Sequence, residues 1–251
     1  MSFIEIIYTD SRADIFLERP DKHNALNSEM LYELSRAFDI IEKKDTCRLI
    51  AIRSRHSAFC SGVDLEQLLS FKSIEEARAF ALHFDETMIR LLKFSKPVIA
   101  VMNGLAYGGG FALASAADLR IMTENGKIAF PAGRLGAVLP PALTFMLNAL
   151  VGIGVSRDLL MTGRTVYAEE ALNLRLINRL VNSQDIEKVL TSEAQQILQS
   201  SDISLQMTRR ITNQQLLVEI EKYNLTGAEN FAFLASTSEW QKRISQFFRK
   251  K

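Results

Sequence analysis

The chain has 251 residues, 47% of them hydrophobic and 24% charged, which is typical of a water-soluble protein with one sizeable core. Its 30 basic and 29 acidic residues leave a formal net charge of +1, so no general attraction to nucleic acids or anionic membranes is expected. The two cysteines, Cys47 and Cys60, exclude a disulfide framework and a CxxC metal site.

Cysteine content and the N-terminal residues predict the compartment. So few cysteines fit a reducing environment. The first residues lack a basic region followed by an apolar one, and no apolar run is expected to approach the roughly 20 residues of a membrane span. We therefore expect a cytoplasmic protein with no bound metal and with no membrane or nucleic-acid partner.

Short apolar runs alternate with amphipathic stretches through the first half of the chain. Asn27 is a candidate N-cap for a helix whose apolar residues recur at helical spacing. The elements expected in chain order are a β-hairpin over 3–7 and 15–17, a helix after Asn27, a strand over 49–52, a helix over 74–92, a strand over 98–102, a helix over 111–117 and a strand over 119–122.

The pattern from residue 142 onward is almost wholly helical and is punctuated by Gly152, Gly154 and Gly163. Strands that alternate with helices, followed by a helical last third, predict an α/β core with an added layer for packing or oligomerisation. We place the core at 1–195 and a helical C-terminal region at 196–251.

Three consecutive glycines, Gly108 to Gly110, follow the buried strand at 98–102 and begin the helix at 111–117. Glycines in such a turn let the backbone pass close to a ligand, and they leave N–H groups free at the start of a helix. Free N–H groups there can stabilise a developing negative charge on oxygen. The segment is therefore a candidate oxyanion site.

Three ordered segments carry a family likeness: 18–27 (ERPDKHNALN), 58–65 (AFCSGVDL) and 101–110 (VMNGLAYGGG), the last continued by 117–120 (ADLR). Shorter matches follow in order at 130–131, 135–136 and 159–164. Together they resemble the crotonase family, also called the enoyl-CoA hydratase/isomerase superfamily, over nearly the whole chain. The resemblance implies an α/β fold in which ββα units form a spiral, with a helical C-terminal region that builds a homotrimer or a dimer of trimers.

The resemblance also implies how a substrate is held. The backbone N–H groups of Val63 and Gly109 are expected to bind the thioester carbonyl of an acyl-CoA and to stabilise an enolate, so CoA arrives as part of the substrate and no other cofactor is tightly bound. The expected substrate-binding residues are Lys22, Ala25, Cys60, Ser61 and Gly62, with Phe247 and Lys250 provided by a neighbouring subunit. Glu66 stands where many members carry a lysine, which weighs against tight CoA binding.

Two expected acids are missing. Hydratases of this family use two glutamates, and their positions fall here on Ala112 and Ala132. A further position used by some relatives falls on Pro140, which has no acid either. A methyl group cannot transfer a proton, so ordinary enoyl-CoA hydration is not expected.

Other side chains could supply the missing chemistry. Asp85 and His83, on the helix over 74–92, and Tyr107, beside the glycines, are candidate bases. Arg134 could bind a substrate carboxylate through both of its terminal nitrogens.

Three functions remain open from the sequence. The first is an enzyme that forms an enolate of an acyl-CoA with an atypical base such as Asp85, or with no base. The second is a decarboxylase of a malonyl-type thioester, in which Arg134 would hold the carboxylate. The third is a non-catalytic acyl-CoA-binding or assembly protein, which a wholly apolar pocket would favour. The sequence leaves open the acyl chain length, the net reaction, and the choice between CoA and carrier-bound pantetheine.

Overall fold

The computed structural model describes residues 2–249, whose strands form two sheets. The six-stranded sheet has the order β1 (Ile4–Thr9), β2 (Arg12–Leu17), β3 (Leu49–Ser54), β5 (Val98–Met102), β7 (Leu119–Thr123) and β10 (Arg179–Val181). The four-stranded sheet has the order β4 (Ala58–Cys60), β6 (Leu105–Tyr107), β8 (Lys127–Ala129) and β9 (Thr165–Tyr167).

From β3 to β8, consecutive strands alternate between the two sheets. β3, β5 and β7 pair in parallel in the first sheet, and the short strand after each, β4, β6 and β8, pairs in parallel in the second. Every residue of β3 and β5 is buried, as expected for parallel strands covered on both faces. The predicted spiral of ββα units is confirmed.

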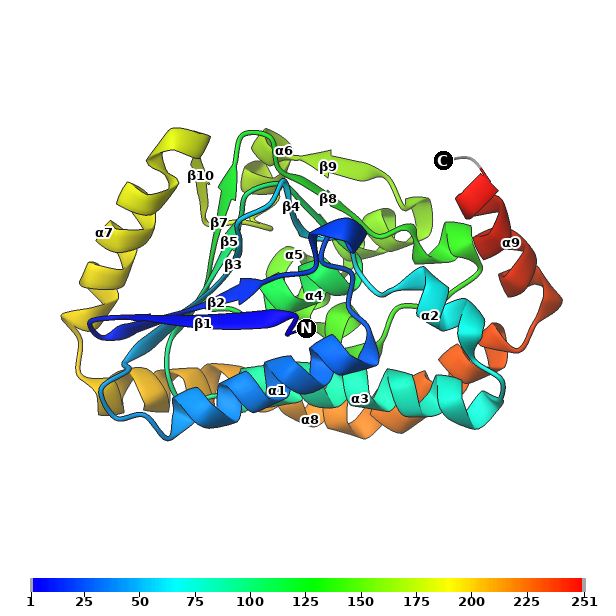
Figure 1. Ribbon diagram of the computed structural model, residues 1–251, viewed down its shortest axis with the longest axis horizontal. Helices are drawn as coiled ribbons and strands as arrows, with labels where there is room; N and C mark the ends of the chain where they lie inside the picture. Colours follow the sequence, from blue (N-terminus) through cyan, green and yellow to red (C-terminus); the bar gives the residue numbers. More distant parts are fainter. Residues whose placement is uncertain (1, 250–251) are drawn as a thin grey trace.

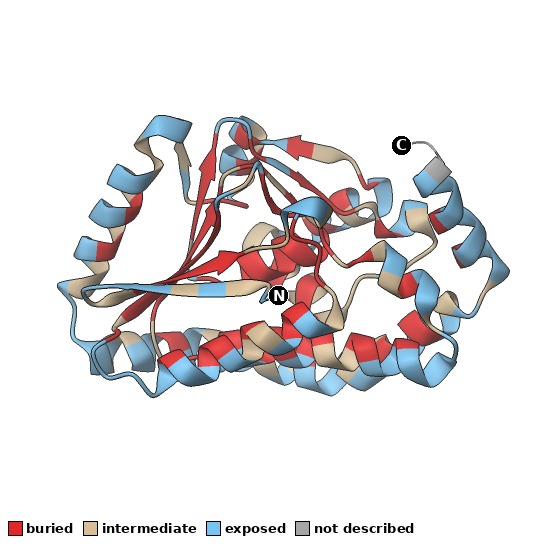
Figure 2. Cartoon of the chain, viewed as in Figure 1, coloured by how far each residue is buried: buried red, intermediate tan, exposed pale blue. Residues whose placement is uncertain are grey.

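Helices surround both sheets. They are α1 (Ser28–Glu42), α2 (Leu65–Ser70), α3 (Ile74–Lys93), α4 (Gly109–Ser115), α5 (Pro141–Thr162), α6 (Ala168–Asn173), α7 (Ile186–Leu198), α8 (Asp202–Ala235) and α9 (Ser238–Arg249), with 3-10 turns η1 (Pro20–Lys22), η2 (Pro131–Leu135) and η3 (Ser183–Asp185). Helices α1, α3 and α8 lie side by side in one layer (Figure 1). Helix α4 is buried at the centre, whereas α7, α8 and α9 expose their outer faces (Figure 2).

Most of the elements expected in the first half of the chain are present. Asn27 caps α1 as predicted, because its side chain accepts a hydrogen bond of 2.8 Å from the N–H of Met30. The prediction that the chain is almost wholly helical after residue 142 is wrong at β9 and β10. Strands of three residues are too short to show an alternating pattern, so the sequence did not predict them.

The boundary placed between residues 195 and 196 falls inside α7. The helices that follow are part of the core, because α8 packs along α3. The buried guanidinium of Arg209 on α8 lies 2.7 Å from a carboxylate oxygen of Asp118 and donates to the carbonyl of Phe94 at the end of α3. The core therefore includes the first part of α8.

The prediction that no apolar run approaches the length of a membrane span is wrong for α5, which is long and apolar enough to cross a membrane by length and composition alone. The first half of α5 packs in the core through Ala142, Leu143, Met146 and Leu147, and Gly152 interrupts the helix with a φ of 75°. A core helix of a water-soluble protein can be equally long and apolar, so length and composition alone are weak evidence of a membrane span.

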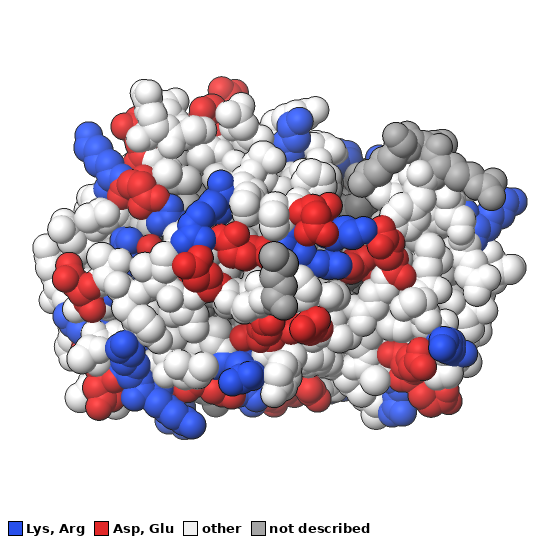
Figure 3. Space-filling view, viewed as in Figure 1, with Lys and Arg blue, Asp and Glu red and all other residues white. Residues whose placement is uncertain are grey.

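On the face drawn in Figure 3, basic and acidic side chains are interspersed, in keeping with the small net charge.

Candidate functional site

A cavity of about 690 Å³ lies where the loops that follow β4 and β6 meet. Residues of η1, the 61–66 loop, α3 and the glycine turn line one part of it. The segment 131–140, the end of α8 and helix α9 line the remainder. The segments that carried the sequence motifs are thus brought to one place.

Close backbone contacts account for two of the glycines. A β-carbon on Gly110 would overlap the carbonyl oxygen of Cys60, so only glycine lets α4 begin this close to the end of β4. Gly62 has a φ of 103°, and a β-carbon there would lie 2.8 Å from the carbonyl oxygen of Tyr107. The two loops are therefore packed directly against one another.

Two backbone N–H groups at this contact have no acceptor within the described residues, 2–249. The N–H of Leu26 donates to Gly62 O over 2.7 Å and the N–H of Asp64 donates to Leu26 O over 2.9 Å, which leaves the N–H of Val63 outside this pairing. Gly109 is the first residue of α4, where an N–H has no acceptor within the helix. Within residues 2–249, no acceptor is found for either N–H, and both residues line the cavity.

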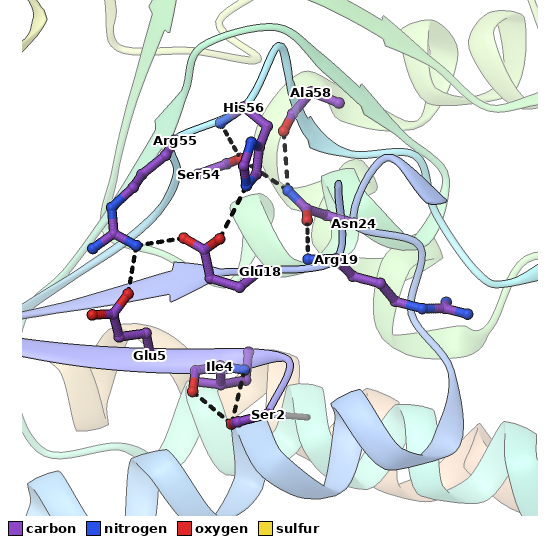
Figure 4. A network of polar contacts seen from close by, with 10 residues as sticks. All are labelled: Ser2, Ile4, Glu5, Glu18, Arg19, Asn24, Ser54, Arg55, His56 and Ala58. Carbon is purple, nitrogen blue, oxygen red and sulfur yellow. Dashed lines mark hydrogen bonds and ion pairs between the residues drawn. The ribbon is translucent and has the colours of Figure 1, made fainter. Parts of the chain in front are cut away.

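A polar network holds the segments that precede the loop carrying Val63 (Figure 4). The side-chain amide of the buried Asn24 donates to Ser54 Oγ over 2.9 Å and to the carbonyls of Ala58 and Phe59 over 3.2 and 3.1 Å. Its oxygen accepts from the N–H of Arg19 over 2.8 Å. Asn24 therefore joins the turn at η1 to strand β4, which leads into the Val63 loop.

A second contact holds the other side of the same loop. The carboxylate of Asp64 lies 2.6 Å from the guanidinium of Arg19, and it also accepts the N–H groups of Glu66 and Gln67 as the N-cap of α2. Both partners of this ion pair are largely buried. Arg19 and Asp64 were not predicted as residues that shape the site, although an aspartate directly before a helix is a recognisable N-cap signal.

Most of the predicted site residues line the cavity. They are Lys22, Ala25, Ser61, Gly62, Val63, Gly109, Arg134 and Phe247. Lys250 lies outside the described residues. Phe247 lines the cavity of its own chain, so a neighbouring subunit is not needed to bring it there.

Cys60 does not line the cavity. Its side chain is fully buried, its Sγ lies 3.8 Å from Gly62 O, and burial raises the pKa of the thiol to about 12. The expectation that Cys60 binds substrate is corrected for its side chain, because the thiol packs behind the cavity wall where the start of α4 crosses β4.

Two cationic side chains at the cavity, those of Lys22 and Arg134, are paired with protein groups. The ammonium of Lys22 lies 2.6 Å from a carboxylate oxygen of Glu66, and this hydrogen bond raises the pKa of Lys22. Arg134 donates from Nε and Nη2 to the carbonyl oxygen of Thr162, over 3.0 and 2.7 Å. The guanidinium of Arg134 therefore stabilises the C-terminus of α5, which leaves it less available for a substrate carboxylate than the sequence predicted.

The positions of the missing acids differ in their surroundings. Ala132 and Pro140 line the cavity, whereas Ala112 is fully buried in α4 and does not. The carboxylates that line the cavity within residues 2–249 are those of Asp21, Asp64 and Glu66, all in the loops of η1 and α2. No group of three or more His, Cys, Asp or Glu side chains in this part of the chain could hold a metal ion.

Of the candidate bases, Tyr107 lines the cavity and Asp85 and His83 do not. Asp85 is buried on α3, and its Oδ1 accepts the N–H of Ala142 over 3.2 Å, at the start of α5. Burial raises the pKa of Asp85 to about 7. Its observed contact is with α5, not with the cavity.

Comparison with known proteins identifies the family. A family model described as enoyl-CoA hydratase/isomerase matches residues 9–251. The chain belongs to this family. The enoyl-CoA hydratase/isomerase relatives include the short-chain-enoyl-CoA hydratase of Clostridium acetobutylicum, 28% identical over 240 residues that make up 95% of this chain and 92% of the relative.

Other members differ in chemistry. A 4-chlorobenzoyl coenzyme A dehalogenase of an Arthrobacter species is 29% identical over 197 residues, which cover 77% of this chain and 71% of the relative. The crystal structure of an enoyl-CoA hydratase from Bacillus halodurans superposes with a TM-score of 0.91 at 24% identity, covering 98% of this chain and all of that one. This likeness confirms the fold of the family.

Proposed function

We propose that this chain binds the thioester of an acyl-CoA and stabilises the enolate form of its carbonyl oxygen with the N–H groups of Val63 and Gly109. The observation that carries this proposal is the pair of unpartnered N–H groups at the cavity. Donors fixed by the fold do not have to reorganise when the charge develops, and each contributes roughly 3–4 kcal/mol in comparable oxyanion sites. Family membership supports acyl-CoA as the ligand.

The CoA arm would lie along the mouth of the cavity. Lys22, Ala25, Ser61 and Gly62 form one side of this mouth, and Phe247 on α9 belongs to the same lining. A lysine can hold a phosphate as a point charge. In this protein Lys22 must first leave Glu66, so its contribution to phosphate binding is reduced.

The proposed chemistry does not include standard enoyl-CoA hydration. Alanine at 112 and 132 leaves no acid to activate water at either position. Tyr107, which lines the cavity beside the glycine turn, is the proposed proton-transfer residue among the three candidates. Decarboxylation of a malonyl-type thioester gains no support, because Arg134 is bonded to the end of α5.

A second candidate function is non-catalytic binding of an acyl-CoA. The observation that favours it is the composition of the cavity between α3, the 135–140 segment and α9, where Phe80, Phe84, Leu139, Ile244 and their neighbours are apolar. A site that lacks a positioned acid or base can hold a thioester without converting it.

We also propose that the protein assembles as a homotrimer or a dimer of trimers. Large apolar side chains are exposed on the second half of α5 and along α8, with Met161 80% exposed and Ile211 71% exposed. Exposed apolar surface of this extent marks a protein–protein contact in a water-soluble chain. Light scattering of the purified protein tests this directly, and a monomer at micromolar concentration would refute it.

The test of the enolate proposal is isotope exchange. The protein is incubated in D₂O with butyryl-CoA, and mass spectrometry follows deuterium at the α-carbon. Exchange above the buffer rate is expected if the oxyanion site is catalytic. Calorimetric binding without exchange would establish the second candidate, and absence of binding would overturn both.

A further inference from the structure

Four aromatic rings form a continuous row, and three of them, Phe80, Phe231 and Trp240, line the cavity. The ring centroids of Phe71 and Phe80 are 5.6 Å apart, those of Phe80 and Phe231 are 6.3 Å apart, and those of Phe231 and Trp240 are 5.3 Å apart with an edge-to-face angle of 88°. The row joins α3, α8 and α9, so the C-terminal helix is fixed to the core by aromatic contacts.

Helix α3 connects the aromatic row to the proposed oxyanion site. Cε2 of Phe84 lies 3.0 Å from the position that a β-carbon on Gly109 would occupy, so this ring touches the start of α4. Phe80 is one helical turn away on the same face of α3, and Phe80, Ala81 and Phe84 all line the cavity. The cavity wall therefore leads from the proposed oxyanion site to Phe231 and Trp240.

The wall along this path is apolar. Leu135, Ala137, Val138 and Leu139 line it together with side chains of α3, α8 and α9, and no carboxylate, ammonium or guanidinium from residues 2–248 lies among the residues of these segments that line the cavity. A charged or hydroxylated acyl group would lose its hydration here without gaining a partner. A hydrocarbon chain loses nothing comparable.

Two buried side chains of α9 line the path beyond Phe231. Trp240 is 1% exposed and Ile244 is fully buried, although both line the cavity. Helix α9, which carries them, contacts α2 and η2 at this end of the molecule (Figure 1). The indole of Trp240 therefore forms part of an end wall and not of an open channel.

Resting on the proposed function, we propose that the acyl portion of the substrate is an unsubstituted hydrocarbon chain and that Trp240 limits its length. Each methylene placed against the apolar wall tightens binding by about fourfold until the chain meets the indole. Trp240 is thus a specificity-determining residue contributed by the C-terminal helix of the same chain.

The test uses the fact that Trp240 is the single tryptophan of the protein. Saturated acyl-CoAs from four to sixteen carbons are titrated by calorimetry and by tryptophan fluorescence. Affinity is expected to rise with chain length to a limit, with the emission of Trp240 changing as that limit is approached. An acyl-CoA of the same length that ends in a carboxylate is expected to bind at least about 100-fold more weakly.

Two variants move the limit. Trp240→Phe keeps an aromatic ring against Phe231 but is smaller, and Trp240→Leu is smaller without the ring. Both are expected to bind an acyl chain two carbons beyond the wild-type limit roughly 15-fold more tightly, since about two more methylenes fit. Phe233→Leu, on the exposed face of α8, is the matched control and leaves the limit unchanged.

The outcomes separate this inference from the proposed function. If no acyl-CoA binds in calorimetry, the proposed function fails. If acyl-CoAs bind, but the emission of Trp240 is constant and the Trp240→Phe profile matches the wild type, the inference about Trp240 is overturned while the proposed function stands. Equal affinity for the carboxylate-ended chain would overturn the hydrocarbon preference.

Discussion

The guanidinium of Arg19 lies 2.6 Å from the carboxylate of Asp64, the residue that directly follows Val63 in the loop that presents its N–H. Arg19 also donates to the carbonyl of Ala25 over 2.8 Å. Asp64 is at the same time the N-cap of α2. The ion pair therefore joins three segments whose relative positions determine where one oxyanion donor points.

Asp64→Asn should separate the charge of this residue from its capping role. Asparagine can still accept the N–H groups of Glu66 and Gln67, but the largely buried Arg19 loses its counter-charge. We expect the free energy of unfolding in urea to fall by about 3 kcal/mol, because an unpaired buried charge is costly. Asp21→Asn is the control. A loss of unfolding free energy below about 0.5 kcal/mol for Asp64→Asn would contradict a stabilising role for the ion pair.

Glu66→Gln should release Lys22 at the mouth of the cavity. We expect the affinity for a butyryl-CoA ligand to rise roughly two- to fivefold at low salt, since the lysine becomes free to bind a phosphate and exposed pairs are weak. The matched comparison is butyryl-pantetheine, which lacks the phosphates. If both ligands gain equally, Lys22 does not act on phosphate; the double variant with Lys22→Gln should cancel the gain.

Acids restored at the two alanines should behave differently. Ala132 lines the cavity, so Ala132→Glu is expected to raise α-deuterium exchange by about 100-fold or more, the contribution of a positioned base, while Ala132→Gln should not. Ala112 is fully buried, and Ala112→Glu is expected to cost at least about 3 kcal/mol of unfolding free energy. An Ala112→Glu variant as stable as the wild type would show that the cavity extends to residue 112.

The buried carboxyl of Asp85 should make stability depend on pH. Its folded pKa is about 7 against an ordinary value near 3.9, so the folded protein retains a proton that the unfolded chain releases. Stability from this group is therefore fully present below about pH 4 and is lost as the pH rises through 7, by roughly 4 kcal/mol in total.

Asp85→Asn tests this dependence. Asparagine can accept the same hydrogen bond from Ala142 but does not ionise, so the variant should gain stability relative to wild type between pH 5 and pH 8. The measurement is the urea unfolding free energy of both proteins at each pH. A difference that stays constant across this range would show that Asp85 is not protonated in the folded protein.

The sequence by itself determined the family, the ββα spiral and the two candidate donors. The family and the spiral could be predicted from short motifs in a fixed order. The candidate donors are backbone groups, so the identities of Gly62, Gly109 and their neighbours were sufficient to predict them. The absence of glutamate at 112 and 132 was also evident, since a missing functional group needs no geometry to be recognised.

Only the tertiary structure decided what the side chains around the donors do. Arg134 is bonded to the carbonyl of Thr162, Glu66 to Lys22 and Arg19 to Asp64, across 28 to 45 residues of chain. The aromatic row likewise joins Phe80 to Trp240. Periodicity and local motifs report which face of an element is buried, whereas the partner of a long side chain depends on how distant elements pack.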